Sequence, residues 1–477
     1  MKKLLIAIVG IGFVAGVYIF IAPPTTPVEK GGITMPTLTK NQLQTILDAQ
    51  VATYEADGFT LSSKDGSYTL TAKDEQKVRA FLVKKLDEVL PDEYAPLMSE
   101  LKTAMTQSNE SILEGTEFEL KVIEDDQSAK LEVVLKKLPD LFKAELAKSP
   151  QDQQTIQNLL DKGSLAYILW LDNKGDFRGV ALKDFNENWV KDNQKVSLSY
   201  TGINEVHEGD YQKKMRSSQA VKSVNFASTE NNQSFDLSIK DVTGTSSQED
   251  IYNKVANVMV KTLLVNSQNP QGKTTATFTD MHLDTLTELE DGFINSSGKY
   301  TISKIEVLGA QNTAINLDNL VVAASAKHIS KEAMLALQTM GITANPQADQ
   351  KAALKAIDTM LKSGLSFDLE AFDMAKLDLN MAQGMPPIEV KNFKFNLHAQ
   401  LKENSLDLSR SNPMMYLPFV TLEGKIEIDS ADLDKLVMLN PMVGMLTGLK
   451  KVEGTQAVFA YAFKEGKITI NGKPLPF

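Results

Sequence analysis

The sequence feature that most constrains the fold is a change of side-chain parity inside a strand-like segment. In IEVKNFKFNLHAQL, from Ile388 to Leu401, apolar residues occupy even positions as far as Val390 and odd positions from Phe393 onward. A β-strand repeats every second residue, so a slip by one position moves the apolar side chains to the opposite face. The segment therefore predicts a strand that is interrupted at Lys391 and Asn392.

The same pattern recurs along the second half of the chain. The strings LSIKDV, ATFTDM, INLDNL and IEVKNF begin at Leu237, Ala276, Ile315 and Ile388, so the first two intervals are equal and the third is nearly twice as long. A looser copy, IEIDSA, begins at Ile426. A recurring interval of this kind is typical of repeat architectures in which each repeat supplies one supersecondary unit.

A β-bulge explains the parity change, because one extra residue in a strand reverses its alternation, bends it and increases its twist. The short side chains of Asn and Asp tolerate unusual backbone dihedrals. We expect bulges at Asp241, Asp280, Asn319 and Asn392. If neighbouring strands bend at one level, the sheet curves into a trough. In the alternative, each string is two short strands joined by a turn, and the sheet is a plain antiparallel layer.

The overall prediction is an α+β fold with four parts. Residues 1–22 are assigned to a transmembrane signal anchor, 23–37 to a linker, 38–220 to a mixed α+β domain, and 221–477 to a repetitive, curved antiparallel β domain with flanking helices. In the mixed domain, helical spacing alternates with two predicted hairpins, one turning at 124–127 and one at 172–175. These elements lack βαβ spacing, which favours an antiparallel sheet.

The N-terminal segment predicts where the chain is located. Lys2 and Lys3 precede an uncharged run from Leu4 to Ala22, which is long enough to span a bilayer. The positive-inside rule then keeps the N-terminus cytoplasmic and places the bulk of the chain in the periplasm, as a bacterial inner-membrane, single-pass protein. A cleaved signal peptide is the competing interpretation.

Charge and composition limit the chemistry. The net charge of −11 and the lack of a basic stripe argue against nucleic-acid binding, and the absence of cysteine removes thiol catalysis, disulfides and cysteine–metal sites. The four histidines, His207, His282, His328 and His398, form no metal-binding motif. We expect no catalytic residues, no metal and no cofactor, and a hydrolase based on paired carboxylates is kept as a lesser alternative.

Apolar strand residues and methionine-rich loops are the candidate binding residues. Methionine adapts to irregular apolar partners, and NPMMYLP and NPMVGML gather several methionines. Filling of a core is the alternative role for them. The predicted ligand-binding residues are Leu317, Leu320, Phe393, Phe395, Leu397, Met414, Met415, Met442 and Met445.

The chain resembles the YdgA-like family of bacterial envelope proteins. The resemblance rests on the Leu4–Ala22 segment, on the strings INLDNLVV and IEVKNFKF, and on the closing FKEGKITINGKPL. More distantly it is similar to AsmA-type proteins, which are thought to carry or shield lipids in a rolled sheet. The resemblance implies no catalytic residues.

These observations lead to one functional prediction and one alternative. The chain is expected to be an anchored, periplasm-facing binding or scaffold protein whose sheet holds a lipid or other hydrophobic ligand. Alternatively, it is a protein–protein interaction module that docks another envelope protein and binds no ligand.

Overall fold

The computed structural model describes residues 33, 37–64, 66–89, 114–124, 128–191, 194–209, 214–250, 252–310, 313–338, 346–381, 387–407, 412–439, 443–444, 447–464 and 466–475. The chain divides into two compact units, one of residues 1–228 and 241–251 and the other of residues 229–240 and 252–477. We describe each unit separately.

Antiparallel strand pairing dominates the described part of the chain. Its strands belong to a 22-stranded sheet in which paired neighbours run antiparallel. The prediction of an α+β fold with an N-terminal transmembrane helix is therefore wrong. Helical periodicity is real as far as Asp161, but the strands between those helices pair with one another and make this part a sheet as well.

The predicted membrane anchor, Leu4–Ala22, lies outside the described residues, as does most of the predicted linker at 23–37. No helix in the described ranges combines the length and the apolar character that a membrane span requires. The prediction of a single-pass inner-membrane location is therefore corrected, since none of the described helices supplies a membrane span.

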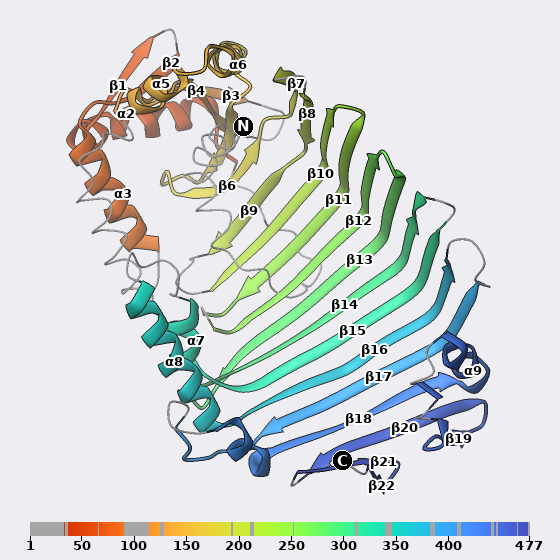
Figure 1. The fold of residues 1–477 in the computed structure, drawn as a ribbon. Coiled ribbons are helices and arrows are strands. Elements are labelled where there is room, and N and C mark those ends of the chain that lie inside the picture. Colours follow the sequence, from red (N-terminus) through yellow and green to blue (C-terminus); the bar gives the residue numbers. More distant parts are fainter. Residues whose placement is uncertain are drawn as a thin grey trace. The chain divides into compact units, whose positions relative to one another are not determined.

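The described part of the first unit combines helices with short strands, as Figure 1 shows. Its helices are α2 (Lys40–Ala56), α3 (Glu75–Val89), α5 (Asp140–Leu146) and α6 (Pro150–Asp161). Its strands are β1 (Phe59–Lys64), β2 (Ser67–Ala72), β3 (Glu117–Glu124), β4 (Ala129–Lys137), β5 (Ala166–Leu171), β6 (Phe177–Leu182), β7 (Phe185–Lys191), β8 (Gln194–Thr201) and β9 (Asn204–Gly209). Two longer strands, β10 (Met215–Glu230) and β11 (Gln233–Gln248), contribute residues to both units.

Helix α2 seals one face of the first unit's sheet. Leu43 and Leu47 are one helical turn apart and so on one side of the helix, and they are 1% and 2% exposed. They join a cluster that includes Leu61, Leu120 and Leu131 from three strands. Both predicted hairpins form here, as β3–β4 and as β5–β6. The helical stretch predicted after the first hairpin is two helices, α5 and α6, separated at 147–149.

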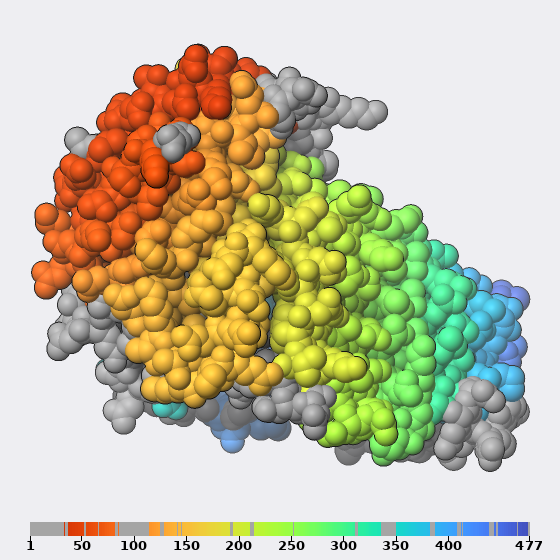
Figure 2. Space-filling view, turned by 90° about the horizontal axis from the view of Figure 1, so that it is seen from above, coloured from red at the N-terminus to blue at the C-terminus, as the bar shows by residue number. Residues whose placement is uncertain are grey.

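The second unit is built on long strands that follow one another in chain order, as the ribbon in Figure 1 and the successive coloured bands in Figure 2 show. The long strands are β12 (Lys254–Asn269), β13 (Gly272–Glu290), β14 (Phe293–Leu308), β15 (Ala314–Ser330), β16 (Leu365–Asn380) and β17 (Ile388–Leu401). Shorter strands follow: β18 (Val420–Asp429), β19 (Lys451–Glu453), β20 (Gln456–Lys464), β21 (Lys467–Ile470) and β22 (Lys473–Pro474).

Helices lie near the two ends of these long strands. Helices α7 (Lys331–Gln338) and α8 (Pro346–Ser363) are inserted between β15 and β16, which explains why the interval between the strings at Ile315 and Ile388 is nearly twice the others. Helix α9 (Ser430–Leu439) follows β18, and a 3-10 helix, η3 (Pro413–Phe419), precedes it.

The four residues at which we expect bulges share one backbone conformation. Asp241, Asp280, Asn319 and Asn392 have φ values of 50°, 48°, 53° and 50°. Only a small left-handed region is open to non-glycine residues at positive φ, and Asn and Asp occupy it most readily. Each of these residues lies inside a single continuous strand, so the strings are not pairs of short strands joined by turns.

Candidate functional site

The register of the second unit aligns apolar residues in rows that cross the strands. Directly opposed residues on antiparallel strands share a face of the sheet. On either side of the positive-φ positions, two rows run from β12 to β17 without interruption. On the far side the rows are Val265–Ala276–Val307–Ile315–Leu379–Ile388 and Leu263–Phe278–Ile305–Leu317–Leu377–Val390. On the near side they are Val260–Met281–Ile302–Leu320–Met374–Phe393 and Val258–Leu283–Tyr300–Val322–Phe372–Phe395.

All four rows lie on one face of the sheet. Val390 and Phe393 end the two inner rows, and their odd spacing along β17 would place them on opposite faces of a regular strand. In the structure, however, Phe393 packs against the cluster that contains Val390. Because opposed residues share a face, the rows that end at these two residues share it too. We call this surface the apolar face.

The parity change therefore keeps apolar side chains on the apolar face instead of moving them to the other side. Asp280, Asn319 and Asn392 lie at one level of the sheet, since the registers pass through them with no shift and place Ser303 and Ala375 on the strands between. No extra residue is inserted opposite its neighbour there, so the prediction of bulges is wrong at these three positions, and each instead has a left-handed residue within an unshifted register. Register shifts do occur elsewhere, near Ile294 and near Leu369.

The other face of the same strands is polar. We call the level of Asp280, Asn319 and Asn392 the switch level. Next to it, one row on the polar face reads Thr279–Lys304–Asp318–Lys376–Lys391, and the next reads Thr277–Glu306–Asn316–Asp378–Glu389. Ion pairs link these rows, including Lys304 with Glu306 at 2.7 Å and Lys376 with Glu389 at 3.2 Å. Such side chains keep this face in water, so the two faces have opposite character.

Most of the apolar face is only half-buried. Met281, Ile302, Ile388 and Val390 are buried, but most other row members are half-exposed, and Ile315 is 43% exposed. Helix α9 covers the end at β17 and β18, where Leu433 joins the cluster of Val390. The face is thus covered at that end, whereas along β13 to β16 its residues other than Met281 and Ile302 are partly accessible.

A groove of about 360 Å³ crosses the accessible part of the apolar face. Its floor is a row of small residues, Thr285–Gly298–Ala324, next to the larger row Leu283–Tyr300–Val322. Phe367, which is 40% exposed, stands on its other side. The groove exists because small side chains, those of the floor row and of Ser296 and Ala326 beyond it, lie between the large row and Phe367.

The structure brings five of the nine predicted binding residues onto this face. Leu317, Leu320, Phe393 and Phe395 belong to the four rows, and Leu397 lies opposite Leu369 at the end of the groove-floor row. The remaining four, all methionines, are not in the rows. Met414 and Met415 are 67% and 49% exposed in η3, while Met442 and Met445 lie outside the described residues.

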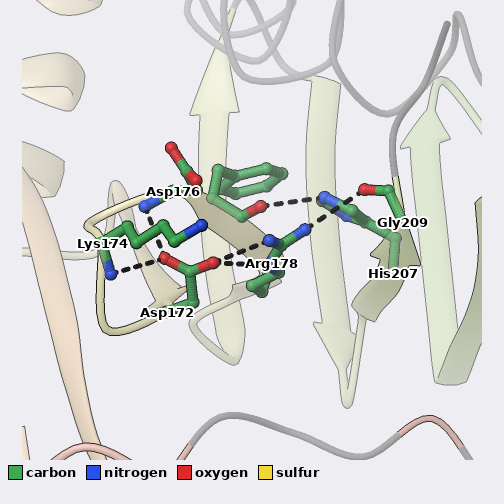
Figure 3. A network of polar contacts seen from close by, with 7 residues as sticks. Asp172, Lys174, Asp176, Arg178, His207 and Gly209 are labelled. Atoms are coloured by element: carbon green, nitrogen blue, oxygen red, sulfur yellow. Dashed lines mark hydrogen bonds and ion pairs between the residues drawn. The ribbon is translucent and has the colours of Figure 1, made fainter.

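A polar site lies in the first unit, around the turn between β5 and β6 (Figure 3). The Asp172 carboxylate accepts hydrogen bonds from the backbone N–H groups of Lys174 and Asp176 at 2.9 and 3.0 Å. It also accepts from Arg178 Nε and Nη2 at 3.1 and 2.7 Å. Burial alone would raise the pKa of Asp172, but the Arg178 and backbone hydrogen bonds outweigh it and lower the pKa below its ordinary value.

Arg178 links this turn to β9. Its Nη1 donates to the Gly209 carbonyl at 3.2 Å, while His207 Nε2 lies 3.0 Å from the carbonyl oxygen of Phe177. His207 and its neighbour on the same face, Glu205, are 4% and 5% exposed. Burial lowers the pKa of His207 to about 4 and raises the pKa of Glu205 to about 7, against smaller opposing effects of the Phe177 carbonyl and of Gln219.

The pKa of Glu205 thus lies above that of His207, the reverse of the usual order of a carboxyl and an imidazole. This consequence of burial was not predicted from the sequence. The string HEGD at 207–210 suggests a solvated polar loop, yet His207 and Glu208 belong to β9. Alternation with Val206 was the available signal, because it puts Glu205 and His207 together on one face. Among the described residues, no group of three or more acidic, histidine or cysteine side chains is arranged to hold a metal ion.

Comparison with protein-family models, with curated proteins and with solved structures found no match. The resemblance to the YdgA-like family therefore stays a prediction.

Proposed function

We propose that the second unit binds a lipid or another long hydrophobic ligand on its apolar face. The observation that carries this proposal is the set of uninterrupted apolar rows, most of whose members stay half-exposed along β13 to β16. Soluble proteins seldom leave large contiguous apolar patches exposed, and such patches mark binding sites. Burying each methylene of a ligand against them contributes about 0.8 kcal/mol.

The groove gives the ligand a direction. Its floor crosses the strands, so a chain lying in it would run along the rows and across β13, β14, β15 and β16. Neighbouring strands are about 4.8 Å apart, so the path over four strands is about 14 Å long, which suits an extended hydrocarbon chain. The opposite face of these strands is a polar ladder, so binding is expected on one face only.

A protein partner is the second candidate, favoured by the exposed methionines of η3. Met414 and Met415 expose flexible thioether side chains that fit irregular apolar surfaces. In this alternative the apolar face or η3 contacts another protein, and no small ligand accompanies the chain.

Native mass spectrometry of the purified full chain, with lipid extraction of the same sample, tests the proposal. A lipid or fatty acid at near-stoichiometric amount is the expected result. A clean apo mass, together with failure to take up added fatty acid, would count against a ligand and in favour of the protein partner.

A groove-filling variant sharpens this experiment. A Cβ added at Gly298 would meet its nearest atoms at 3.6 and 3.8 Å, which is ordinary contact distance, so Gly298→Val should fold. Because valine also favours strands, the stability of the variant should not fall. The amount of bound ligand should fall by most of its value, because the valine side chain fills the groove. Ala323→Val is the matched control, since Ala323 adjoins the floor residue Ala324 but points to the polar face. Equal loss of ligand in both variants would contradict the groove as the site.

A further inference from the structure

A separate pocket of about 1000 Å³ lies entirely within the first unit. Its wall is formed by β4, β5, β6 and β9, which pair in that order. One row across this sheet contains Trp170, Gly179 and Val206, and the neighbouring row contains Ile168 and Ala181. All but one of these residues, Gly179, line the pocket.

Gly179 allows β9 to approach β6 closely in this wall. A Cβ at Gly179 would lie 2.6 Å from the Glu205 carbonyl oxygen and 3.0 Å from Val206 Cγ1, so no larger residue fits without a shift. Trp170, directly opposite Gly179 on β5, is half-buried and presents its indole to the pocket. The wall is thus an aromatic and aliphatic surface.

The opposite face of the same four strands is the sealed core. Leu131, Val133 and Val180 alternate with the pocket-lining positions, and all three are buried. The pocket side therefore does not take part in the packing under α2. Its rim is held by main-chain hydrogen bonds, from Ala129 N to Leu38 O at 2.6 Å and from Leu182 N to Ile203 O at 2.9 Å.

Two lysines lie at the β4 edge of this pocket. Lys130 Nζ lies 5.4 Å from the centroid of the Trp170 ring, within the range of a cation–π interaction. Lys183 Nζ lies 2.9 Å from Glu132 Oε1, and Glu132 is on the same face of β4 as Lys130. Two ammonium groups and one carboxylate thus lie along this edge. The other acidic group at the pocket, Asp184, follows Lys183 in the chain and accepts the N–H of Gly202 at 2.9 Å.

We propose that this pocket binds a small aromatic molecule that carries one anionic group, a carboxylate or a sulfonate. The ring system packs against Trp170, Ile168 and Val206, and the anion lies at the β4 edge near Lys130 and Lys183. An aromatic wall beside a charged edge is a common arrangement in ligand pockets, in which a few polar groups fix the orientation of an apolar body. This site is independent of the apolar face of the second unit.

Tryptophan fluorescence isolates the pocket from the rest of the molecule. The chain has two tryptophans, Trp170 and Trp189, so Trp189→Phe leaves Trp170 as the sole reporter and the second unit contains none. The probe is 8-anilinonaphthalene-1-sulfonate, compared with N-phenyl-1-naphthylamine, which has the same rings and lacks the anion. In the full chain carrying Trp189→Phe, we expect saturable energy transfer from Trp170 to the sulfonate and about tenfold weaker binding of the neutral analogue.

Charge-neutral variants test the role of the lysines. Lys130→Gln and Lys183→Gln should each weaken the binding of the sulfonate severalfold. The affinity for the neutral analogue should stay unchanged in both variants. Lys195→Gln, an exposed lysine of β8 outside the pocket, is the matched control and should change neither. Gly298→Val in the second unit should also leave the transfer from Trp170 unchanged.

Three results would overturn the inference. These are the absence of energy transfer from Trp170, equal affinity for the anionic and neutral probes, and insensitivity of sulfonate binding to both pocket lysines. Far-ultraviolet circular dichroism of every variant confirms that it is folded. Failure of the second unit to bind lipid would not alter any of these readouts, so the two proposals succeed or fail separately.

Discussion

The two units use similar antiparallel strands but treat their apolar surfaces differently. In the first unit, α2 lies on the sheet and its cluster residues Leu43 and Leu47 are almost fully buried. In the second unit, four rows of apolar residues cross β12 to β17, yet helix α9 covers them only at the β17–β18 end. An apolar strand face is therefore not evidence of a sealed core, because sealing depends on which other elements reach it.

The largest effect that tests this comparison is expected for matched leucine truncations. Leu43→Ala removes a fully buried side chain and should lower the free energy of unfolding of the first unit by about 3–4 kcal/mol. Leu320→Ala removes a half-exposed one and should cost about half as much, since less area is lost from the interior. Urea unfolding followed by tryptophan emission reports the first unit, which holds both tryptophans, and circular dichroism reports both units, so the second is obtained by comparing the two signals. Equal costs would show that the apolar face is as well sealed as the core under α2.

Glu205 should make the stability of the first unit depend on pH. At pH below about 4.5 the carboxyl is protonated in both the folded and the unfolded chain, so its burial has no ionisation cost. As the pH rises from there to the folded pKa of about 7, only the unfolded chain ionises, and the free energy of unfolding falls by about 3 kcal/mol in total. A denaturation series of His207→Gln from pH 4.5 to 8 should show this fall alone, and adding Glu205→Gln should remove most of it.

His207 should give the stability of the first unit a pH dependence of the opposite sign. Its folded pKa of about 4 lies below the ordinary 6.5, so as the pH falls between those values the unfolded chain binds a proton first and the unit loses stability. The two slopes oppose each other over much of this range, so the natural chain should vary less than either single variant. Glu205→Gln should therefore lose stability toward acid. If neither variant depended on pH more strongly than the natural chain, the two groups would not be buried as described.

The smallest of these effects concerns the parity switch. Asn319 has a φ of 53°, and replacement by a residue with a Cβ but no polar group should cost about 1 kcal/mol. Asn319→Ala is therefore expected to lower the unfolding midpoint of the second unit, whereas Asn319→Gly should not, since glycine adopts positive φ without steric cost. If both variants were equally destabilised, the amide side chain rather than the backbone conformation would be what matters at this position.

Local sequence signals predicted the elements better than their assembly. The parity change at Asp280, Asn319 and Asn392 identified backbone positions that do adopt positive φ, and the β3–β4 and β5–β6 hairpins were also predictable. The α+β class was wrong because helical periodicity in the segments before Asp161 says nothing about whether the intervening strands pair with one another.

Sites that depend on distant pairing left few local signals in the sequence. The wall of the Trp170 pocket requires β9 to pair with β6 across the intervening hairpin of β7 and β8. The same pairing buries His207 and Glu205, which a string of polar letters presents as a loop. The apolar rows, by contrast, were partly foreseen through Leu317, Leu320, Phe393, Phe395 and Leu397, since each lies in or directly after a repeated string.

The unshifted register at the switch level makes the width of the second unit adjustable. From Asp280 to Asn319 the chain advances by two strands and returns to the same level of the sheet. Inserting or deleting one such pair would leave every row intact and change the width of the sheet by two strand spacings, about 9.6 Å. The extent of the apolar face across the strands is therefore set by the number of repeats. The α7–α8 insertion shows that a connection between repeats accepts additional residues while the rows stay in register.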